Sequence, residues 1–108
     1  MEIPHVTQAE FEDLWDGRGR SPPSSWIVWF SASWCRPCHR LDRPTIAAAA
    51  AARGTLLLQC DAAKNKYTPG YANVYSLPTF VFYKPGREIA RITSSDTTSV
   101  VAWINAQQ

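Results

Sequence analysis

The feature that most constrains this chain is a pair of cysteines separated by two residues, in the sequence Trp34-Cys35-Arg36-Pro37-Cys38. Thiols at this spacing can close into a small disulfide, and reopen, with little movement of the backbone. The apolar run at residues 26–30 predicts a buried strand just before the pair, and the alanine-rich residues 47–52 favour a helix after it. A Cys-x-x-Cys between a strand and a helix start is typical of a dithiol/disulfide redox site.

The composition predicts one globular domain, residues 1–108, large enough to bury a core without disulfide staples or a structural metal. The net charge of +2 includes no block of like charges, so we expect no nucleic-acid partner. No apolar run approaches the roughly 20 residues that a membrane span needs, so we expect no membrane insertion. We expect the protein to be a monomer.

The N-terminus and the cysteines together indicate a compartment. Residues 1–6 lack a basic segment followed by an apolar one, so we do not interpret them as a signal peptide. Three cysteines cannot all pair within the chain, and two of them at redox spacing fit a reducing compartment better than a secreted scaffold. We therefore expect a cytoplasmic protein.

The residues before the cysteine pair predict a short strand and a helix. Residues 3–6 are a strand candidate, and Pro4 suits the edge of a sheet. Thr7 and Glu10 have the spacing of a capping box, which begins a helix. That helix presents an apolar stripe of Phe11, Leu14 and Trp15 and ends at Gly17.

The residues after the pair predict one long helix, further strands and a last helix. The helix should run to about Arg53 with a kink at Pro44, because proline removes a helical hydrogen bond. Strands are predicted at 55–60, 79–83 and 88–93, the last two as a hairpin, with room for a short helix in the polar residues 61–75. A cap at 94–96 begins a helix that directs these residues to the core: Val100, Val101, Trp103, Ile104. The order β-α-β-α-β-α-β-β-α predicts an α/β fold with a single mixed sheet flanked by helices on both faces.

These motifs make the chain similar to the thioredoxin family over almost its whole length. The resemblance is carried by Trp34-Cys35-x-Pro37-Cys38 after a strand, by Leu77-Pro78-Thr79 entering a later strand, and by the hairpin turn at Gly86. It implies the thioredoxin fold, a cis Leu77–Pro78 bond beside the disulfide, and a substrate chain docked on the backbone near Leu77.

The chain also departs from the family pattern. Arg36 stands where thioredoxins usually have glycine, and Pro44 comes one residue later than the family's helix proline. Thr93 replaces a glycine that lines the docking surface, which would narrow that groove. Trp29 occupies the place of a buried aspartate, and Leu57 the place of its lysine partner. A basic chain with tryptophan at this place is similar to the kinetoplastid thioredoxins.

The residues of the motif predict the roles of the two thiols. Cys35, at a helix start, would be stabilised as a thiolate by free N–H groups and the helix dipole, and would attack a substrate disulfide. Cys38, one turn later and expected to be less exposed, would then attack Cys35 and release the reduced substrate. Pro37 would stiffen the turn, and Arg36 would tune the site by its charge.

Neighbouring residues complete the expected site. Trp34 and Pro78, with Leu77, would form an apolar lip for the substrate. Tryptophan at position 29 and leucine at position 57 replace both members of the family's buried charge pair. Replacing both charges by apolar side chains can leave the stability of the fold unchanged or raise it. We therefore expect Cys38 to lose its proton to water or to the departing Cys35 sulfur.

Three further side chains are weaker candidates. We interpret Cys60, at a strand end, as a small buried hydrophobe. His39 points about 100° away from Cys38 on a helix, so we interpret it as solvated. The remaining tryptophans are expected to pack in the core: Trp15, Trp26, Trp103.

The sequence favours a thioredoxin-type reductase of protein disulfides with no bound cofactor, and it leaves alternatives open. The Arg-Pro pair between the cysteines allows a thiol oxidase or disulfide isomerase of the same fold. A zinc or redox-inactive binding module is disfavoured, because only His5, His39 and Cys60 could join the pair and none has finger spacing. The family resemblance implies an NADPH-dependent flavoprotein reductase as electron donor, and the kinetoplastid similarity a low-molecular-weight dithiol.

Overall fold

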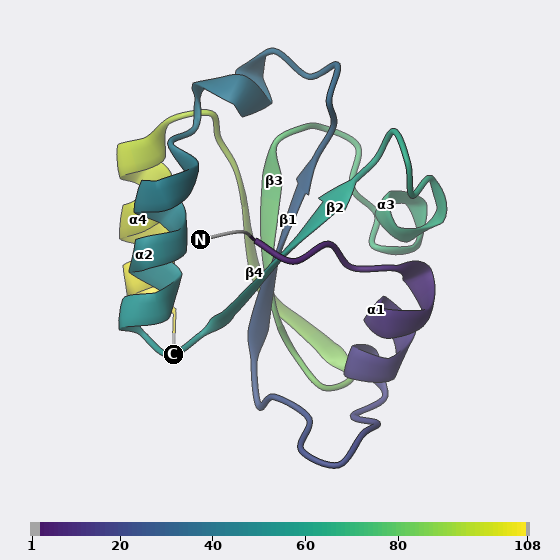
Figure 1. The fold of residues 1–108 in the computed structure, drawn as a ribbon. Helices are drawn as coiled ribbons and strands as arrows, with labels where there is room; N and C mark the ends of the chain where they lie inside the picture. The colour runs from purple at the N-terminus through teal and green to yellow at the C-terminus, as the bar shows by residue number, and fades with distance from the viewer. Residues whose placement is uncertain (1–2, 108) are drawn as a thin grey trace.

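The computed structural model describes residues 3–107, in which a four-stranded mixed sheet lies between two layers of helices (Figure 1). The strand order is β2 (Leu56–Asp61), β1 (Trp26–Ser31), β3 (Thr79–Lys84) and β4 (Arg87–Thr93). β1 is parallel to β2 and antiparallel to β3, and β3 and β4 form the predicted hairpin. The predicted α/β class with a mixed sheet is thus confirmed.

Helices cover both faces of this sheet, as predicted. In Figure 1, α2 (Arg43–Ala52) and α4 (Thr97–Ala106) lie together on one side of the sheet, and α1 (Gln8–Trp15) and α3 (Tyr67–Tyr71) lie on the other. Because both faces are covered, every residue of β1 is buried, which explains its nearly unbroken apolar sequence. Alternate side chains of β1 then enter two separate cores.

The helix ends follow the sequence signals. Thr7 accepts the Glu10 N–H at 3.1 Å while the Glu10 side chain accepts the Thr7 N–H at 2.9 Å, so the predicted capping box begins α1. Phe11 is buried, and Leu14 and Trp15 pack half-buried against the same core.

The last helix begins at the predicted cap. Asp96 accepts the Ser99 N–H at 2.9 Å and so begins α4. Val100 and Ile104 enter the core and Trp103 packs against it, whereas Val101 is only half-buried outside that cluster. Within residues 3–107, no helix has the length and apolar character needed to cross a membrane.

The predicted strand at residues 3–6 is wrong in extent, because the segment makes only one bridge. His5 pairs with Gln59 of β2 in parallel, with the Val6 N–H donating to the Gln59 carbonyl at 2.9 Å and the Gln59 N–H to the Pro4 carbonyl at 2.8 Å. Pro4 has no N–H to extend the ladder. The regular elements therefore begin with α1.

The single kinked helix predicted after the cysteines is also wrong. A 3₁₀ helix, η1 (Pro37–Arg40), ends where Leu41 turns extended at φ −78° and ψ 136°, and α2 begins separately at Arg43. Pro44 therefore lies in the first turn of α2, where a missing N–H costs nothing. In a continuous helix its ring would clash with the carbonyl four residues earlier, so the chain breaks instead of bending.

Candidate redox site at the ends of the parallel strands

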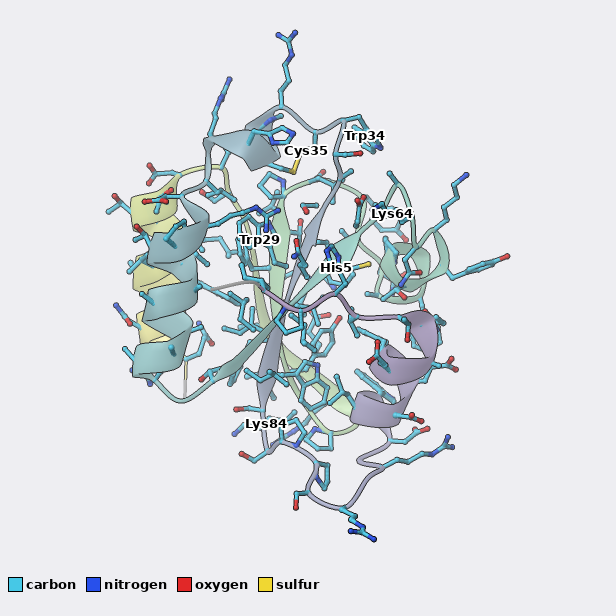
Figure 2. The ribbon with its side chains drawn as sticks, viewed as in Figure 1. His5, Trp29, Trp34, Cys35, Lys64 and Lys84 are labelled. Carbon is cyan, nitrogen blue, oxygen red and sulfur yellow. A yellow bond between two sulfur atoms is a disulfide. The ribbon has the colours of Figure 1, made fainter. Side chains whose placement is uncertain are left out.

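The Cys35–Cys38 disulfide lies just beyond the carboxyl end of β1, with 5.4 Å between the two Cα atoms. Figure 2 shows it at the tip of the molecule, above the sheet and close to the labelled Trp34. The chain turns sharply there, because the Cys35 N–H donates to the Ala32 carbonyl at 3.0 Å. Parallel β1 and β2 end at this same edge, which is where open α/β sheets commonly hold their functional groups.

One hydrogen bond distinguishes the two sulfur atoms. The backbone N–H of Cys38 points at Cys35 Sγ, with 3.2 Å between nitrogen and sulfur. A donor in this position stabilises negative charge on Cys35. The expected dipole of a long helix is replaced by η1, which has only four residues, so this N–H is the backbone donor that favours the Cys35 thiolate.

The predicted difference in exposure is wrong. Cys35 is 4% exposed and Cys38 is 7% exposed, so both are buried and the resolving candidate is slightly the more accessible. Cys35 and Cys38 pack in a small cluster with Ala32, and Leu77 lies against it. The distinction between the thiols therefore depends on the Cys38 N–H and not on exposure.

Cys35 lines a groove of about 660 Å³, which we call the Cys35 groove. Trp34, predicted as an apolar lip, is 68% exposed at this groove, and Tyr75 is 87% exposed. Arg36, Pro37 and Leu77 also line it, as do three residues that we did not expect: Ala62, Pro69, Val74. The Cys35 groove thus joins most of the predicted site residues, with Tyr75 as the main addition.

The Leu77–Pro78 peptide bond is cis, as the resemblance implied. Pro78 is buried, and its carbonyl accepts the Ser94 N–H at 3.3 Å. Thr93 is not among the residues that line the Cys35 groove, and its hydroxyl lies 2.7 Å from the hydroxyl of Thr79. That hydrogen bond joins the end of β4 to the start of β3 directly after the cis bond.

Cys38 lines a different depression, of about 750 Å³, which we call the Cys38 pocket. It lies where β1 and β2 end, between the N-terminal segment, η1 and the start of α2. Its lining is mostly polar and comes from five segments of the chain: Ile3, His5, Ser31, Ala32, Ser33, Cys38, His39, Arg43, Gln59, Asp61.

Trp29 and Leu57 both lie in the core between the sheet and α2. The Trp29 ring packs against Phe80 with 4.9 Å between centroids, and the guanidinium of Arg43 lies 4.6 Å above its face. The indole N–H is buried and has no hydrogen-bond partner among residues 3–107. An aromatic and an aliphatic side chain thus fill the places where the family resemblance puts a buried charge pair.

Cys60 is buried as predicted, whereas His39 is exposed as predicted but also contacts the backbone. Cys60 is fully buried, and burial, with Asp61 nearby, raises the pKa of its thiol to about 12. His39 is exposed, but its Nε2 lies 2.9 Å from the Ser33 carbonyl, so the ring links η1 to the turn before Cys35. Among residues 3–107, no three His, Cys, Asp or Glu side chains converge as metal ligands would.

Some of these groups had a weak sequence signal and others had none. Tyr75 is an aromatic residue in a polar stretch two residues before Leu77, which is a weak signal for an exposed contact. The Cys38 pocket joins His5, Gln59 and Arg43 across more than fifty residues of sequence, and no local pattern indicates that they meet.

Comparisons with known proteins agree with this geometry. A family model described as Thioredoxin matches residues 2–106. Thioredoxin H2-1 of Oryza sativa subsp. japonica is 27% identical over 99 residues, which is 92% of this chain and 71% of the relative. A protein disulfide-isomerase A6 homolog of Caenorhabditis elegans is 28% identical over 111 residues, but these cover 98% of this chain and only 24% of the relative.

A solved structure shows the same arrangement of elements. The thioredoxin of Fasciola hepatica superposes with a TM-score of 0.78 and 28% identity, covering 99% of this chain and 100% of that one. Because the family model spans nearly the whole chain and its two active-site cysteines are joined in the structure, this chain belongs to the thioredoxin family and is a thiol–disulfide oxidoreductase.

Proposed function

We propose that this oxidoreductase reduces disulfides of protein substrates, with Cys35 as the attacking thiol and Cys38 as the resolving thiol. The hydrogen bond from the Cys38 N–H to Cys35 Sγ carries the assignment, because it stabilises Cys35 as the attacking thiolate.

The reaction then has two exchange steps. The Cys35 thiolate attacks one sulfur of the substrate disulfide, forms a mixed disulfide and expels a substrate thiolate, which takes a proton from solvent. The Cys38 thiolate next attacks Cys35 Sγ, closes the Cys35–Cys38 disulfide and releases the second substrate thiolate. Two electrons pass from the protein to the substrate.

The Cys35 groove is our proposed docking surface. Trp34 and Tyr75 are the exposed aromatic side chains of its lining, and such rings bind an extended peptide at little conformational cost. The backbone at Leu77, with Pro78 after it, would accept the substrate chain beside the disulfide. Arg36 would favour substrates with acidic residues near the reactive cysteine.

The resolving step proceeds without the family's buried carboxylate in this proposal. Trp29 and Leu57, which stand in the places of the family's charge pair, carry no group that could accept the proton of Cys38. Water in the Cys38 pocket is one acceptor for the Cys38 proton, and the substrate sulfur that departs when Cys38 attacks Cys35 Sγ is the other. The expected acceptor, the Cys35 sulfur, is wrong, because that sulfur enters the new disulfide and carries no charge. Asp61 lines the same pocket, with one of its oxygens accepting the Ala63 N–H at 2.9 Å.

The cellular setting is part of the proposal. A redox pair beside a third cysteine that is buried and unpaired suits a reducing compartment, and we infer the cytoplasm. There the protein would act in electron transport and cell redox homeostasis, without a bound cofactor. Its electron donor would be an NADPH-dependent thioredoxin reductase or a low-molecular-weight dithiol.

Single cysteine variants test the roles. Cys38→Ser should trap a mixed disulfide with a substrate protein, because no thiol remains to resolve it, whereas Cys35→Ser should form none. In the reduced wild type, Cys35 should be alkylated first near neutral pH, and peptide mass spectrometry measures the order. Preferential alkylation of Cys38, with trapping by Cys35→Ser, would reverse the assignment.

A thiol oxidase or disulfide isomerase is the second candidate. Arg36, next to the attacking cysteine, favours the reduced thiolate and so makes the disulfide more oxidising. The similarity to a protein disulfide-isomerase A6 homolog is compatible with this alternative. The reduction potential separates the two functions, because an oxidase or isomerase has a more oxidising disulfide than a reductase.

A further inference from the structure

The two cysteines of the disulfide line different hollows of the surface. Cys35 lines the Cys35 groove and is absent from the Cys38 pocket, and Cys38 lines the Cys38 pocket and is absent from the groove. A nucleophile must approach a disulfide along the extension of the S–S bond. A nucleophile that enters the Cys38 pocket would approach the cysteine that does not attack the protein substrate.

Arg43 is a held cation in the Cys38 pocket. Its guanidinium lies 4.6 Å above the Trp29 ring and donates to Oε1 of Gln59 at 3.0 Å. Gln59 is fixed in turn, because its Nε2 donates to the Ile3 carbonyl at 2.6 Å. Within residues 3–107, Arg43 forms no ion pair with a carboxylate. A guanidinium with a fixed plane and no acidic partner is suited to bind a carboxylate.

Asp61 supplies the opposite charge in the same pocket. One carboxylate oxygen accepts the Ala63 N–H at 2.9 Å, which leaves the other oxygen without a hydrogen-bond donor among the described residues. His5 and His39, with Ser31 and Ser33, complete the polar lining. The volume of about 750 Å³ lies within the range of small-molecule sites, so the pocket has the size and charges for a small zwitterion.

We propose that the Cys38 pocket binds a small thiol that carries a carboxylate and an amine, the chemistry of a thiol amino acid or short thiol peptide, and that this thiol reduces the disulfide by attacking Cys38. The carboxylate contacts Arg43 and the ammonium contacts Asp61. This inference names the electron donor and therefore rests on the proposed function.

The reaction balances with two molecules of the thiol. The thiolate of the first attacks Cys38 Sγ, the S–S bond breaks, and its electron pair leaves on Cys35 Sγ as a thiolate. The thiolate of the second attacks the outer sulfur of the mixed disulfide and releases the small disulfide and the Cys38 thiolate. Each cysteine thiolate takes up a proton that the small thiols gave up, so two thiols become one disulfide.

The leaving group makes Cys38 the favourable point of attack. A disulfide is cleaved faster when the departing thiolate is the more stable one. Attack at Cys38 expels Cys35, which the Cys38 N–H stabilises at 3.2 Å, whereas attack at Cys35 expels Cys38, which receives no such bond among the described residues. Access through the pocket and the stability of the departing sulfur therefore favour the same sulfur.

The first measurement locates the bond that forms. The oxidised protein is mixed with cysteine, and excess iodoacetamide caps the released protein thiolate. Peptide mass spectrometry should find the cysteine adduct on Cys38 and the cap on Cys35. The reverse pattern, or no reduction by cysteine, would overturn the proposal.

The second measurement tests the two charges with three thiols: cysteine, N-acetylcysteine, which lacks the ammonium, and cysteamine, which lacks the carboxylate. In Arg43→Met, which keeps an aliphatic stem over Trp29, the rate with N-acetylcysteine relative to cysteamine should fall about 3- to 10-fold. Arg43→Lys should restore part of the loss. Asp61→Asn should change the same ratio in the opposite direction.

Arg40→Met is the matched control, because Arg40 is exposed on η1 and lies outside the Cys38 pocket. If Arg43→Met and Arg40→Met gave equal ratios, the carboxylate contact would be disproved. The proposed function is scored separately, by whether protein reduced with dithiothreitol cleaves the disulfides of insulin. Loss of that activity would refute the protein-disulfide reductase, whereas an adduct on Cys35 would refute only the pocket.

Discussion

At the scale of single residues, the most informative position is 29, where an indole lies between the sheet and α2 (Figure 2). Its neighbours are Phe80 at 4.9 Å and the Arg43 guanidinium at 4.6 Å. Leu57 lies in the same cluster. Losing one member of a buried ion pair leaves an uncompensated charge, but replacing both by apolar groups can be neutral or stabilising. The joint presence of Trp29 and Leu57 is therefore physically coherent.

Trp29→Asp should destabilise the protein by roughly 3–5 kcal/mol, because it removes a buried aromatic side chain and places a carboxyl in an apolar core. Desolvation should raise the pKa of that carboxyl. A raised native-state pKa favours the folded protein at low pH, so the penalty should shrink as the pH falls. Urea denaturation at several pH values measures this, with Trp29→Phe as the control for volume. If Trp29→Asp were as stable as wild type and reduced disulfides faster at neutral pH, the hypothesis that the apolar site works without a carboxylate would be refuted.

Cys60 gives a pH dependence with a definite sign. Burial raises the pKa of its thiol from an ordinary value of 9.0 to about 12. Between these values the unfolded chain loses the proton while the folded chain keeps it, so the thiol stabilises the fold below pH 9 and this contribution is lost as the pH rises toward 12.

The oxidised wild type should therefore lose stability more steeply above pH 9 than oxidised Cys60→Ala, which has no thiol to titrate. Denaturant titrations at a series of pH values between 8 and 10.5 compare the two slopes. Cys60 should also resist iodoacetamide at neutral pH. Equal slopes, or rapid labelling of native Cys60, would contradict a deeply buried thiol.

At the scale of elements, the break between η1 and α2 determines how the site is built. Leu41 is extended, and the Asp42 N–H donates to the hydroxyl of Thr97 at 3.0 Å, at the start of α4. The cysteines therefore lie on a separate 3₁₀ turn and not on the first turn of a long helix. Because α2 starts at Arg43, that side chain is placed in the Cys38 pocket.

Pro44→Ala tests this arrangement. A proline inside a helix costs about 3 kcal/mol or more, so removing it from a kinked interior should stabilise the protein by a similar amount. In the first turn of α2 the substitution should change the free energy of unfolding by less than about 1 kcal/mol, mainly through the unfolded chain. Thermal and urea unfolding give the value, and a gain near 3 kcal/mol would favour the continuous helix.

The sequence was sufficient for elements that local patterns determine. The apolar runs of β1 and β3, the capping box at Thr7 and the cap at Asp96 are all in their predicted places. The sequence does not predict the break at Leu41, because helix propensity is high on both sides of Pro44. A proline in the interior kinks a helix, whereas a proline in the first turn begins a new one, and the local sequence does not distinguish the two cases.

The candidate site was predictable only where one motif contains it. Trp34 to Cys38 and Leu77–Pro78 could be named from sequence, and the structure brings Trp34, Cys35 and Leu77 to one groove. The near-equal burial of the two cysteines and the Cys38 pocket depend on tertiary packing among distant segments. A pattern of neighbours in sequence carries no information about them.

At the scale of the whole molecule, helical layers cover both faces of the sheet (Figure 1). The disulfide lies beyond the carboxyl end of β1, and its two cysteines line two hollows of different character. On one side are the exposed rings of Trp34 and Tyr75, and on the other are Arg43 and Asp61. Substrate and donor would thus reach different sulfurs of one bond. The poise of that bond decides whether electrons leave toward substrates or arrive from them.

The reduction potential should lie on the reducing side of about −180 mV, the value of protein disulfide isomerase, and toward the roughly −270 mV of thioredoxin. Membership of the family and the packed surroundings of both cysteines argue for this value. Arg36 opposes it, because a positive charge beside Cys35 favours the reduced thiolate. Since 30 mV corresponds to about 1.4 kcal/mol for this couple, an exposed charge worth a few tenths of a kcal/mol should shift the potential by roughly 10 mV.

Arg36→Gln should therefore make the disulfide more reducing by about 10 mV, and Arg40→Gln, on the same turn but outside the Cys35 groove, should shift it less. Glutamine is suitable because Arg36 has ordinary helical dihedrals, φ −62° and ψ −47°, and needs no glycine. Equilibration with glutathione buffers, read by alkylation and mass, gives each potential. A wild-type value more oxidising than about −180 mV would favour the oxidase or isomerase, and in that case Arg36→Gln should bring the potential back toward a reductase.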